Sequence, residues 1–349
     1  MADSPSYERS GVDISAGDRA VELIAKHAEA THRPEVLSKL GGFAGAFDAR
    51  FEGLEEPVLL SASDGVGTKL TFAQTLDRHD TVGVDLVAMV VDDLVCHGAE
   101  PLFLLDYIAC GKLVPSRIER IVAGIAEGCR VAGCALLGGE TAEHPGVMEP
   151  DAYDLAAFAV GVADKRSMWG PDRVSEGDVV VGIASSGLHS NGYSLVRRIV
   201  LEHDLDLSAT PPELNGVTLG DALLEPTTIY SPALLSLRSS GIDVHAAAHI
   251  TGGGIAGNLT RALPPGLEAR LDPGSWPVPP IVTYLQKTGQ IDPEEMEKAF
   301  NLGLGMTMVI SEGHAEPSVR ALGERGLAAY IVGRVYRGER GVAFEERST

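Results

Sequence analysis

The chain has 349 residues, of which 44% are apolar, so it is long enough for two domains with full hydrophobic cores. Its formal net charge of −21 opposes binding to nucleic acid and to anionic membrane surfaces, and we expect neither as a partner. No apolar run reaches membrane-spanning length, and the polar, acidic stretch Met1–Asp18 lacks the features of a secretory signal or a transit peptide. These features together predict a cytoplasmic protein.

Apolar, β-branched segments alternate with helical segments along the first half. The predicted elements are strand Pro57–Ser63, helix Thr81–His97, strand Pro101–Ala109, helix Pro115–Val131, a short strand at Cys134–Glu140 that ends at its glycines, and strand Asp154–Asp164. Turn-forming residues then interrupt the pattern between Ser167 and Asp178. This break indicates a domain boundary.

After the break the alternation starts again. The predicted elements are strand Val179–Ala184, a glycine loop, helix Tyr193–Glu202, strand Asp243–Ile250, a second glycine loop and a short helix that ends at Leu263. The pattern predicts an α/β or α+β chain with an N-terminal domain at 1–168 and a C-terminal domain at 169–349.

The motif DGVGTK, Asp64–Lys69, directly follows a predicted strand. Gly65 and Gly67 free the backbone to approach a ligand, Lys69 supplies a positive charge and Asp64 can hold a metal ion. Backbone amides, one cation and one carboxylate suit phosphate chemistry. An ordinary glycine turn with a surface lysine explains this motif equally well.

The helical segment that follows is apolar nearly all round, which predicts a buried helix, yet it carries Asp85, Asp92 and Asp93. Asp85 and Asp92 are seven residues apart and share one helical face. Because unpaired buried carboxylates are costly, we expect the group to meet a cation, and Mg²⁺ with nucleotide phosphates fits. We expect Asp93 to be buried, and for Asp92 alone we favour pairing with an arginine or capping of the next element.

Three further loops carry polar groups beside glycines. In GGETAEH, Glu140 follows Gly138 and Gly139 at a strand end, where ligand contacts collect. In SSGLHSNGYSLVR, Tyr193 replaces the lysine of a P-loop, so the motif is not a Walker A. Its Ser190 and Asn191 precede a helix and suit an anion, whereas His189 could act as an acid, a base or a phosphate contact.

The last glycine loop is HITGGGIAGNL, in which Gly252, Gly254 and Gly257 match GxGxxG, with Asp272 about twenty residues later. Only a short helix fits before Pro264, and the loop comes late in the chain. We therefore favour a phosphate-binding loop over a dinucleotide site.

Taken in order, these motifs resemble the aminoimidazole ribonucleotide synthetase family, also called phosphoribosylformylglycinamidine cyclo-ligases. The resemblance extends from about Gly11 to about Val335 and rests on GVDISAG, RPEVL, LGGFAG, DGVGTK, GVDLVAM with DDL and GAEPLFLLDY, GGETAE, GLHSNGYSLVR and HITGGG. It departs from the family at Asp18 and Asp92, where the family often has asparagine.

The resemblance implies a two-domain ATP-dependent synthetase fold shared with selenophosphate synthetase, thiamine-monophosphate kinase and a hydrogenase maturation factor. The N-terminal mixed-sheet domain would pair with its copy in a homodimer and bind ATP with Mg²⁺, and the C-terminal α/β sandwich domain would bind substrate and phosphate. The implied reaction closes the ring of formylglycinamidine ribonucleotide to give aminoimidazole ribonucleotide, ADP and phosphate, a step of purine synthesis. ATP would phosphorylate the formamide oxygen.

The resemblance also implies the site residues. Catalysis would involve Lys69, His189, Asp64 and Asp93, and the metal ligands would be Asp64, Asp93 and Glu140. The nucleotide would contact Asp64, Gly65, Gly67, Thr68, Lys69, Asp85, Asp93, Gly138, Gly139 and Glu140. The phosphorylated substrate would contact His189, Ser190, Asn191, Gly252, Gly253 and Gly254.

Four other functions compete with this interpretation. Thiamine-phosphate kinase is the alternative in the same superfamily, and mainly the motif series argues against it. Selenophosphate synthetase would need a reactive cysteine near the N-terminus, whereas the first cysteine here is Cys96. An oxidoreductase would use the Gly252–Gly257 loop for NAD(P), and a non-catalytic binding protein would not need five polar glycine loops.

Overall fold

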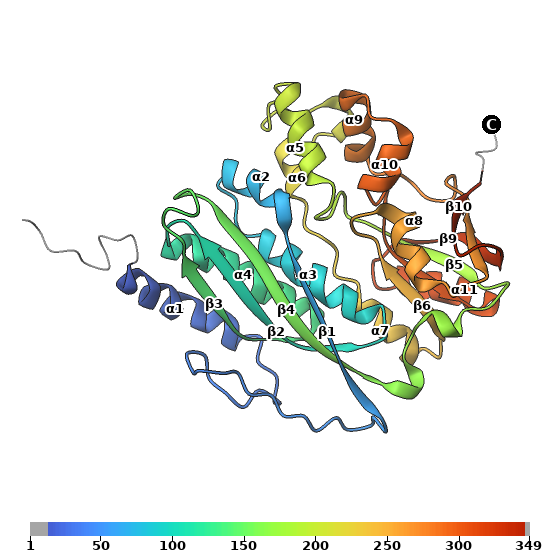
Figure 1. Cartoon of the computed structure of the whole chain (residues 1–349), viewed down its shortest axis with the longest axis horizontal. Helices are drawn as coiled ribbons and strands as arrows, with labels where there is room; N and C mark the ends of the chain where they lie inside the picture. Colours follow the sequence, from blue (N-terminus) through green and yellow to red (C-terminus); the bar gives the residue numbers. More distant parts are fainter. Residues whose placement is uncertain (1–12, 346–349) are drawn as a thin grey trace, which may run out of the picture.

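The computed structural model describes residues 13–345 and forms two α/β halves, each built on its own sheet (Figure 1). The first half contains α1 (Ile14–Glu29), β1 (Pro57–Gly65), α2 (Leu70–Thr75), α3 (Val82–Val95), β2 (Glu100–Cys110), α4 (Pro115–Ala132), β3 (Ala135–Glu143) and β4 (Tyr153–Asp164). The initial residues of the GVDISAG motif, Gly11 and Val12, lie outside the described residues.

The first sheet has the strand order β1-β4-β2-β3 and is mixed, because β2 and β3 run parallel while the other pairs are antiparallel. Helices α3 and α4 cover one face, and α1 packs on α4. The opposite face is open, since β4 alternates between buried residues and exposed ones such as Ala156 and Phe158. This alternation is typical of a sheet with one solvated face.

Close helix packing explains two glycines of this half. A Cβ at Gly83 of α3 would lie 2.2 Å from the backbone nitrogen of Ile125 in α4, and a Cβ at Gly124 would meet the carbonyl oxygen of Asp80 at the same distance. Only glycine permits such an approach. The tight α3–α4 contact fixes the position of α3, which carries the acidic residues toward the second half.

The second half contains β5 (Val179–Ala184), α5 (Tyr193–Glu202), α6 (Leu219–Leu224), α7 (Ser231–Ser239), β6 (Val244–His249), α8 (Gly254–Leu259), β7 (Leu267–Leu271), α9 (Pro280–Gly289), α10 (Pro293–Ala299), β8 (Leu304–Ile310), α11 (Glu312–Gly323), β9 (Ala329–Arg337) and β10 (Gly341–Phe344). Its six strands have the order β10-β7-β9-β5-β8-β6. Every residue of the interior strand β8, which lies between β5 and β6, is buried.

The two sheets with their helices confirm the predicted fold class. Strand β5 and helix α5 have the predicted bounds, and β1, α3, β2, α4, β4 and β6 lie within two residues of theirs. The prediction that the third strand ends at its glycines was wrong, because β3 pairs with β2 through Gly138, Gly139 and beyond. The boundary at 168/169 stays a prediction; it lies between β4 and β5. Among residues 13–345, no helix is both long and apolar enough to cross a membrane.

Candidate active site

A cavity of about 450 Å³ lies between the two halves. Its walls come from β1, the C-terminal end of α3, β6 and the turn that follows α8, and they include Ser63, Asp93, His249 and Arg261. The walls belong to segments far apart in sequence, so this cavity exists only when the two halves pack together. An interdomain cleft with convergent polar groups is a common place for a ligand site.

Asp93 and His249 form an ion pair at the wall of this cavity, with 3.0 Å between Asp93 Oδ1 and His249 Nδ1. Burial alone lowers the pKa of His249, but the bond from Asp93 and the charges of Asp92, Asp93 and Asp64 together raise it above its usual value. Nε2 of His249 is buried without a hydrogen-bond partner among the described residues. A protonated His249 therefore presents an unused N–H donor, which suits an anionic oxygen.

The expectation that Asp93 is buried was wrong, because 43% of its side chain is exposed. The neighbouring Asp92 takes the buried position instead. Asp92 accepts hydrogen bonds from the backbone amides of Tyr230 and Ser231 at 2.9 Å each, and so caps the N-terminus of α7. Asp92 thus acts as a cap, as predicted, but the element that it caps is the distant helix α7 and not the next element along the chain.

Asp64 lies at the end of β1 and accepts a hydrogen bond from the Gly65 amide at 2.7 Å. Burial raises the pKa of Asp64, and the charge of Asp93 adds to this rise. The structure thus brings two of the predicted metal ligands within electrostatic reach of each other. Within the described part of the chain no three His, Cys, Asp or Glu side chains group as a protein-only metal site. Two carboxylates nevertheless fit Mg²⁺, which usually takes one or two carboxylates together with water and substrate phosphates.

Lys69 does not face a ligand site, which corrects the prediction that it neutralises phosphate charge. Its side chain is fully buried, and Nζ donates to Asp85 Oδ1 at 2.8 Å, to the His189 carbonyl at 3.1 Å and to the Glu225 carbonyl at 2.6 Å. Burial lowers the pKa of Lys69, and Asp85 opposes that change. The amine ties the DGVGTK loop of the first half to two loops of the second half.

Asp85 is equally buried, which disagrees with its predicted contact with the nucleotide, although its Oδ2 has no hydrogen-bond partner among the described residues. Its Oδ1 accepts from Lys69 and also from the amide and the hydroxyl of Thr227, at 2.7 and 2.6 Å. A buried carboxylate that receives three hydrogen bonds has no remaining need for a metal ion at that oxygen. Asp85 thus stabilises the domain contact.

His189 is also fully buried, contrary to the prediction that it contacts substrate as an acid, a base or a phosphate ligand. Its backbone has a φ of 60°, and its Nε2 accepts a hydrogen bond from the Ser186 amide at 3.2 Å. Burial lowers the pKa of His189 well below its usual value, and His249 and Lys69 add to this effect. A neutral, enclosed imidazole shapes the loop.

The other residues of that loop lie beside the second predicted substrate loop. A Cβ at Gly252 would lie 3.9 Å from Asn191 Oδ1, so the two glycine-rich loops are neighbours. The Asn191 Nδ2 group is buried without a partner among residues 13–345. Thr68 of the first half touches the start of α5 through Ser194, with 3.0 Å between their hydroxyl oxygens. The predicted substrate contacts Asn191 and Gly252 are therefore brought together.

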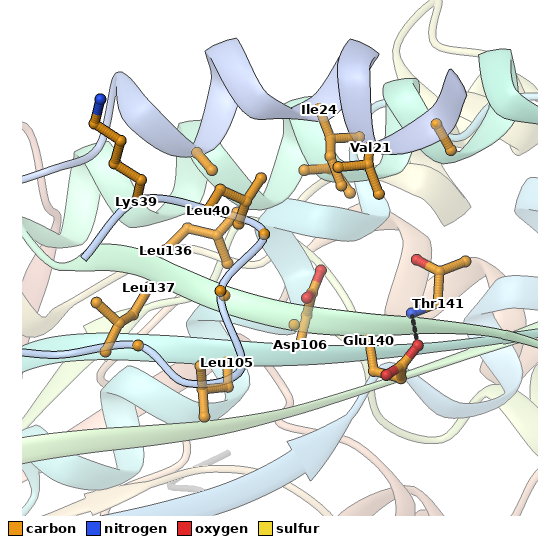
Figure 2. A pocket seen from close by; sticks show the side chains of 18 of the residues that line it. Val21, Ile24, Lys39, Leu40, Leu105, Asp106, Leu136, Leu137, Glu140 and Thr141 are labelled. Atoms are coloured by element: carbon orange, nitrogen blue, oxygen red, sulfur yellow. Dashed lines mark hydrogen bonds between the residues drawn. The ribbon is translucent and has the colours of Figure 1, made fainter. Parts of the chain in front are cut away.

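Glu140 does not join Asp64 and Asp93 at one metal within a single chain, which corrects the predicted ligand set. Asp64, Ala157, Asp106 and Gly139 pair in one row across the sheet, which places Gly139 three strands from Asp64, or about 14 Å. Glu140 is the next residue along β3 and so points to the opposite face. Figure 2 shows this opposition, with Asp106 directed toward α1 and Glu140 directed away from it.

A second cavity, of about 640 Å³, lies between α1 and the sheet and is lined mainly by apolar side chains such as Val21 and Ile24 (Figure 2). Asp106 extends into it, and burial raises the pKa of this carboxyl group to about 7. A Cβ at Gly139 would lie 1.5 Å from Asp106 Oδ1, so glycine is required there to accommodate the carboxyl group. The sequence interpretation assigned Gly139 to nucleotide binding and did not single out Asp106.

The sequence interpretation also missed His249 and Arg261 as site residues. His249 opens the HITGGG motif, so a signal was present, but attention went to its glycines. Arg261 follows the short helix α8, and only the three-dimensional contact between the halves places it at the cavity.

Comparison with known proteins supports a single family. The sequence models of the AIR synthase related protein N-terminal and C-terminal domains match residues 49–163 and 175–345. The chain is 53% identical over 340 residues to the phosphoribosylformylglycinamidine cyclo-ligase of Geobacillus kaustophilus, with 97% of each chain covered.

Solved structures share the fold at low sequence identity. A hydrogenase maturation protein HypE in complex with ATP has a TM-score of 0.68 at 19% identity, with 96% of this chain and 92% of that one covered. A thiamine-monophosphate kinase from Stenotrophomonas maltophilia has a TM-score of 0.67 at 18% identity, with 94% and 97% covered. The kinase shares the architecture alone, whereas the identity of more than half over nearly the full length shows that the chain belongs to the phosphoribosylformylglycinamidine cyclo-ligase family.

Proposed function

We propose that this chain is an ATP-dependent cyclo-ligase that converts formylglycinamidine ribonucleotide to aminoimidazole ribonucleotide, ADP and phosphate. The observation that supports it most strongly is the pairing of Asp93 with His249 beside Asp64, at a cavity between two domains. Phosphoryl transfer depends mainly on positioning and on charge neutralisation, and the carboxylates of this cluster would hold the Mg²⁺ ion that neutralises the charge. Ring closure then joins a nitrogen to the activated carbon.

The chain's residues have distinct parts in the proposed reaction. Asp64 and Asp93 would hold Mg²⁺, which supplies charge neutralisation to the transferring phosphoryl group when it is bound. Asp93 also raises the pKa of His249, and the Nε2–H of the protonated ring would donate to a phosphoryl oxygen. The neighbouring loops of Asn191 and Gly252 orient the substrate.

The chemistry accounts for the need for ATP. A formamide carbonyl is a poor electrophile, and transfer of the γ-phosphoryl group to its oxygen gives an iminophosphate with a good leaving group. The ribose-bearing nitrogen then attacks the same carbon, and phosphate departs as the imidazole forms. ATP use also agrees with the ATP-bound structure of HypE, which shares the fold.

We further propose that the chain is a homodimer paired through the open face of the first sheet. Three large apolar side chains are exposed on that face, Leu59 at 60%, Tyr107 at 44% and Phe158 at 43%. Exposed apolar surface of this kind marks a contact between proteins. Glu140 lies on the same face, which makes it available to the nucleotide site of the opposite copy. The predicted cytoplasmic location stays a prediction.

A turnover assay tests the proposed function. The purified chain is incubated with formylglycinamidine ribonucleotide, ATP and Mg²⁺, and both ADP and the aromatic amine are measured, with thiamine monophosphate as the alternative acceptor. Equal amounts of ADP and amine, formed only with the ribonucleotide, support a cyclo-ligase. Phosphorylation of thiamine monophosphate without amine would contradict the proposal and favour the kinase alternative.

A further inference from the structure

The cavity between the halves contains only one fixed positive charge from lysine or arginine among the described residues. Arg261 lines it together with Ser63, Asp93, His97 and His249. Lys69, the cation expected at this site from the sequence, is fully buried and bound to Asp85. A phosphorylated substrate therefore has one guanidinium available at this wall.

Arg261 has no carboxylate within ion-pair distance among residues 13–345. Its guanidinium makes a single long hydrogen bond, from Nη1 to Asn258 Oδ1 at 3.4 Å. The chain carries a formal net charge of −21, and most of its arginines among the described residues are paired with acids, as Arg270 is with Glu268 at 2.8 Å. Arg261 belongs to the minority of the described arginines that are not, and it is the one of them that lines this cavity. An unpaired guanidinium at a cavity wall suits an anion from outside the protein.

The surroundings of Arg261 are rigid and connected to the glycine loop. Asn258 is 3% exposed, and its Nδ2 donates to the carbonyls of Thr251, Gly252 and Gly254 at 2.9–3.3 Å. Arg340 donates to the carbonyls of Thr260 and Arg261 at 3.1 and 3.4 Å, which holds the turn from the other side. The glycine loop and the guanidinium thus form one preorganised unit.

The unpartnered Nε2 of His249 provides an independent indication of a ligand in the same cavity. This nitrogen is buried at the wall and has no acceptor in the part of the chain that the structure describes, while Nδ1 faces Asp93. Arg261 and His249 therefore offer two donors to one cavity, one from a permanent cation and one beside the acidic cluster. Because Arg261 is a permanent cation and His249 lies beside carboxylates, we expect the two donors to bind different parts of one ligand.

We infer that Arg261 binds the phosphate monoester of the ribonucleotide substrate, while the formamide end of the substrate lies toward His249 and Asp93. Arginine forms paired, charge-assisted hydrogen bonds with a phosphate dianion, and these bonds confer affinity as well as orientation. The ATP phosphates lie instead at Asp64 and Asp93 in the proposed function on which this inference depends. Arg261 then determines the specificity of the enzyme for a nucleotide over the corresponding nucleoside.

The test compares Arg261→Met, Arg261→Lys and the control Arg270→Met, an exposed arginine on β7. Loss of the guanidinium should raise the KM for formylglycinamidine ribonucleotide roughly 30-fold, whereas the KM for ATP should change less than about 2-fold. The KM of Arg261→Lys for formylglycinamidine ribonucleotide should lie between those of the wild type and Arg261→Met, because lysine keeps the charge but not the paired geometry. Arg270→Met should behave as the wild type, and thermal melts should agree for all four proteins.

Ribose 5-phosphate separates failure of this inference from failure of the proposed function. Calorimetry should show that it binds the wild type and loses roughly 30-fold in affinity in Arg261→Met, without any turnover being required. Equal affinity for the two proteins would overturn the inference even if the wild type is an active cyclo-ligase. A rise in the KM for ATP alone would overturn it as well, since Arg261 would then contact the nucleotide.

Discussion

The replacement of Lys69 by methionine gives the most detailed test of the corrected role of this lysine. Methionine fills a similar volume but removes the amine, which now bonds three oxygens of the protein. Asp85 would remain buried with a negative charge and with donors from Thr227 alone. Removal of one partner of a buried ion pair costs about 3–5 kcal/mol of unfolding free energy.

The expected shift in melting temperature follows from the size of the chain. An unfolding entropy of about 2.1 cal/mol/K per residue gives roughly 0.7 kcal/mol/K for 349 residues. A loss of 3–5 kcal/mol therefore lowers the midpoint by about 4–7 °C if unfolding is one cooperative transition. The double variant Lys69→Met with Asp85→Asn should recover part of this loss, because the buried site then contains no charge.

The same proteins distinguish a structural lysine from a phosphate ligand. Calorimetry gives the midpoints, and a coupled ADP assay gives kcat and the KM for ATP in the wild type, both single variants and the double variant. The structure predicts that the double variant regains stability and turnover together. A stable double variant with turnover reduced roughly 100-fold or more would refute the reasoning and show that Lys69 acts on the phosphates directly.

Three further predictions concern other parts of the molecule. Asp106→Asn should match the wild type in free energy of unfolding near pH 4, and its advantage over the wild type should grow by about 2–3 kcal/mol between pH 5 and pH 8. The reason is that the folded protein raises the pKa of Asp106 from 3.8 to about 7, so that ionisation of this group at higher pH destabilises the wild type alone. Denaturant melts at the three pH values check this prediction, and a difference that does not change with pH would contradict it. Tyr107→Glu on the open face should turn the dimer into monomers in light scattering, whereas Val131→Glu, equally exposed on α4, should not. Asp93→Asn should keep the melting temperature, because the side chain is partly exposed, and should lower the pKa of His249 in NMR titrations, because Asp93 raises that pKa. Turnover should fall about 100-fold or more if Asp93 holds the metal ion. An unchanged turnover would show that Asp93 holds no metal.

The sequence allowed most of the first half and the start of the second to be predicted, because apolar periodicity is strong there. Strand β5 and helix α5 have clear turn signals on both sides and agree with their predicted bounds. Strand β3 runs past its glycines because its pairing with β2 outweighs the low strand propensity of glycine. Beyond Leu263 no elements were predicted, although β7 to β10 complete the second sheet.

The site was less predictable, because side-chain direction depends on contacts between the halves. Residue types identified an acidic helix, but only packing shows that Asp92 faces inward as a cap and that Asp93 faces the cavity. Lys69 was interpreted as a phosphate ligand since glycine-rich loops with lysine commonly bind phosphate, yet Asp85 lies within 2.8 Å of it in the fold. Sheet register alone separates Glu140 from Asp64.

The fate of the formyl oxygen tests the central claim most directly. Formylglycinamidine ribonucleotide labelled with ¹⁸O in its formyl group is converted with ATP and Mg²⁺, and the released phosphate is analysed by mass spectrometry. If the Asp64, Asp93 and His249 site directs the γ-phosphoryl group to that oxygen, each phosphate should carry one ¹⁸O atom, in equal amount to the aminoimidazole ribonucleotide formed. Unlabelled phosphate accompanied by the same product would contradict phosphorylation of the formamide oxygen and the mechanism proposed for this site.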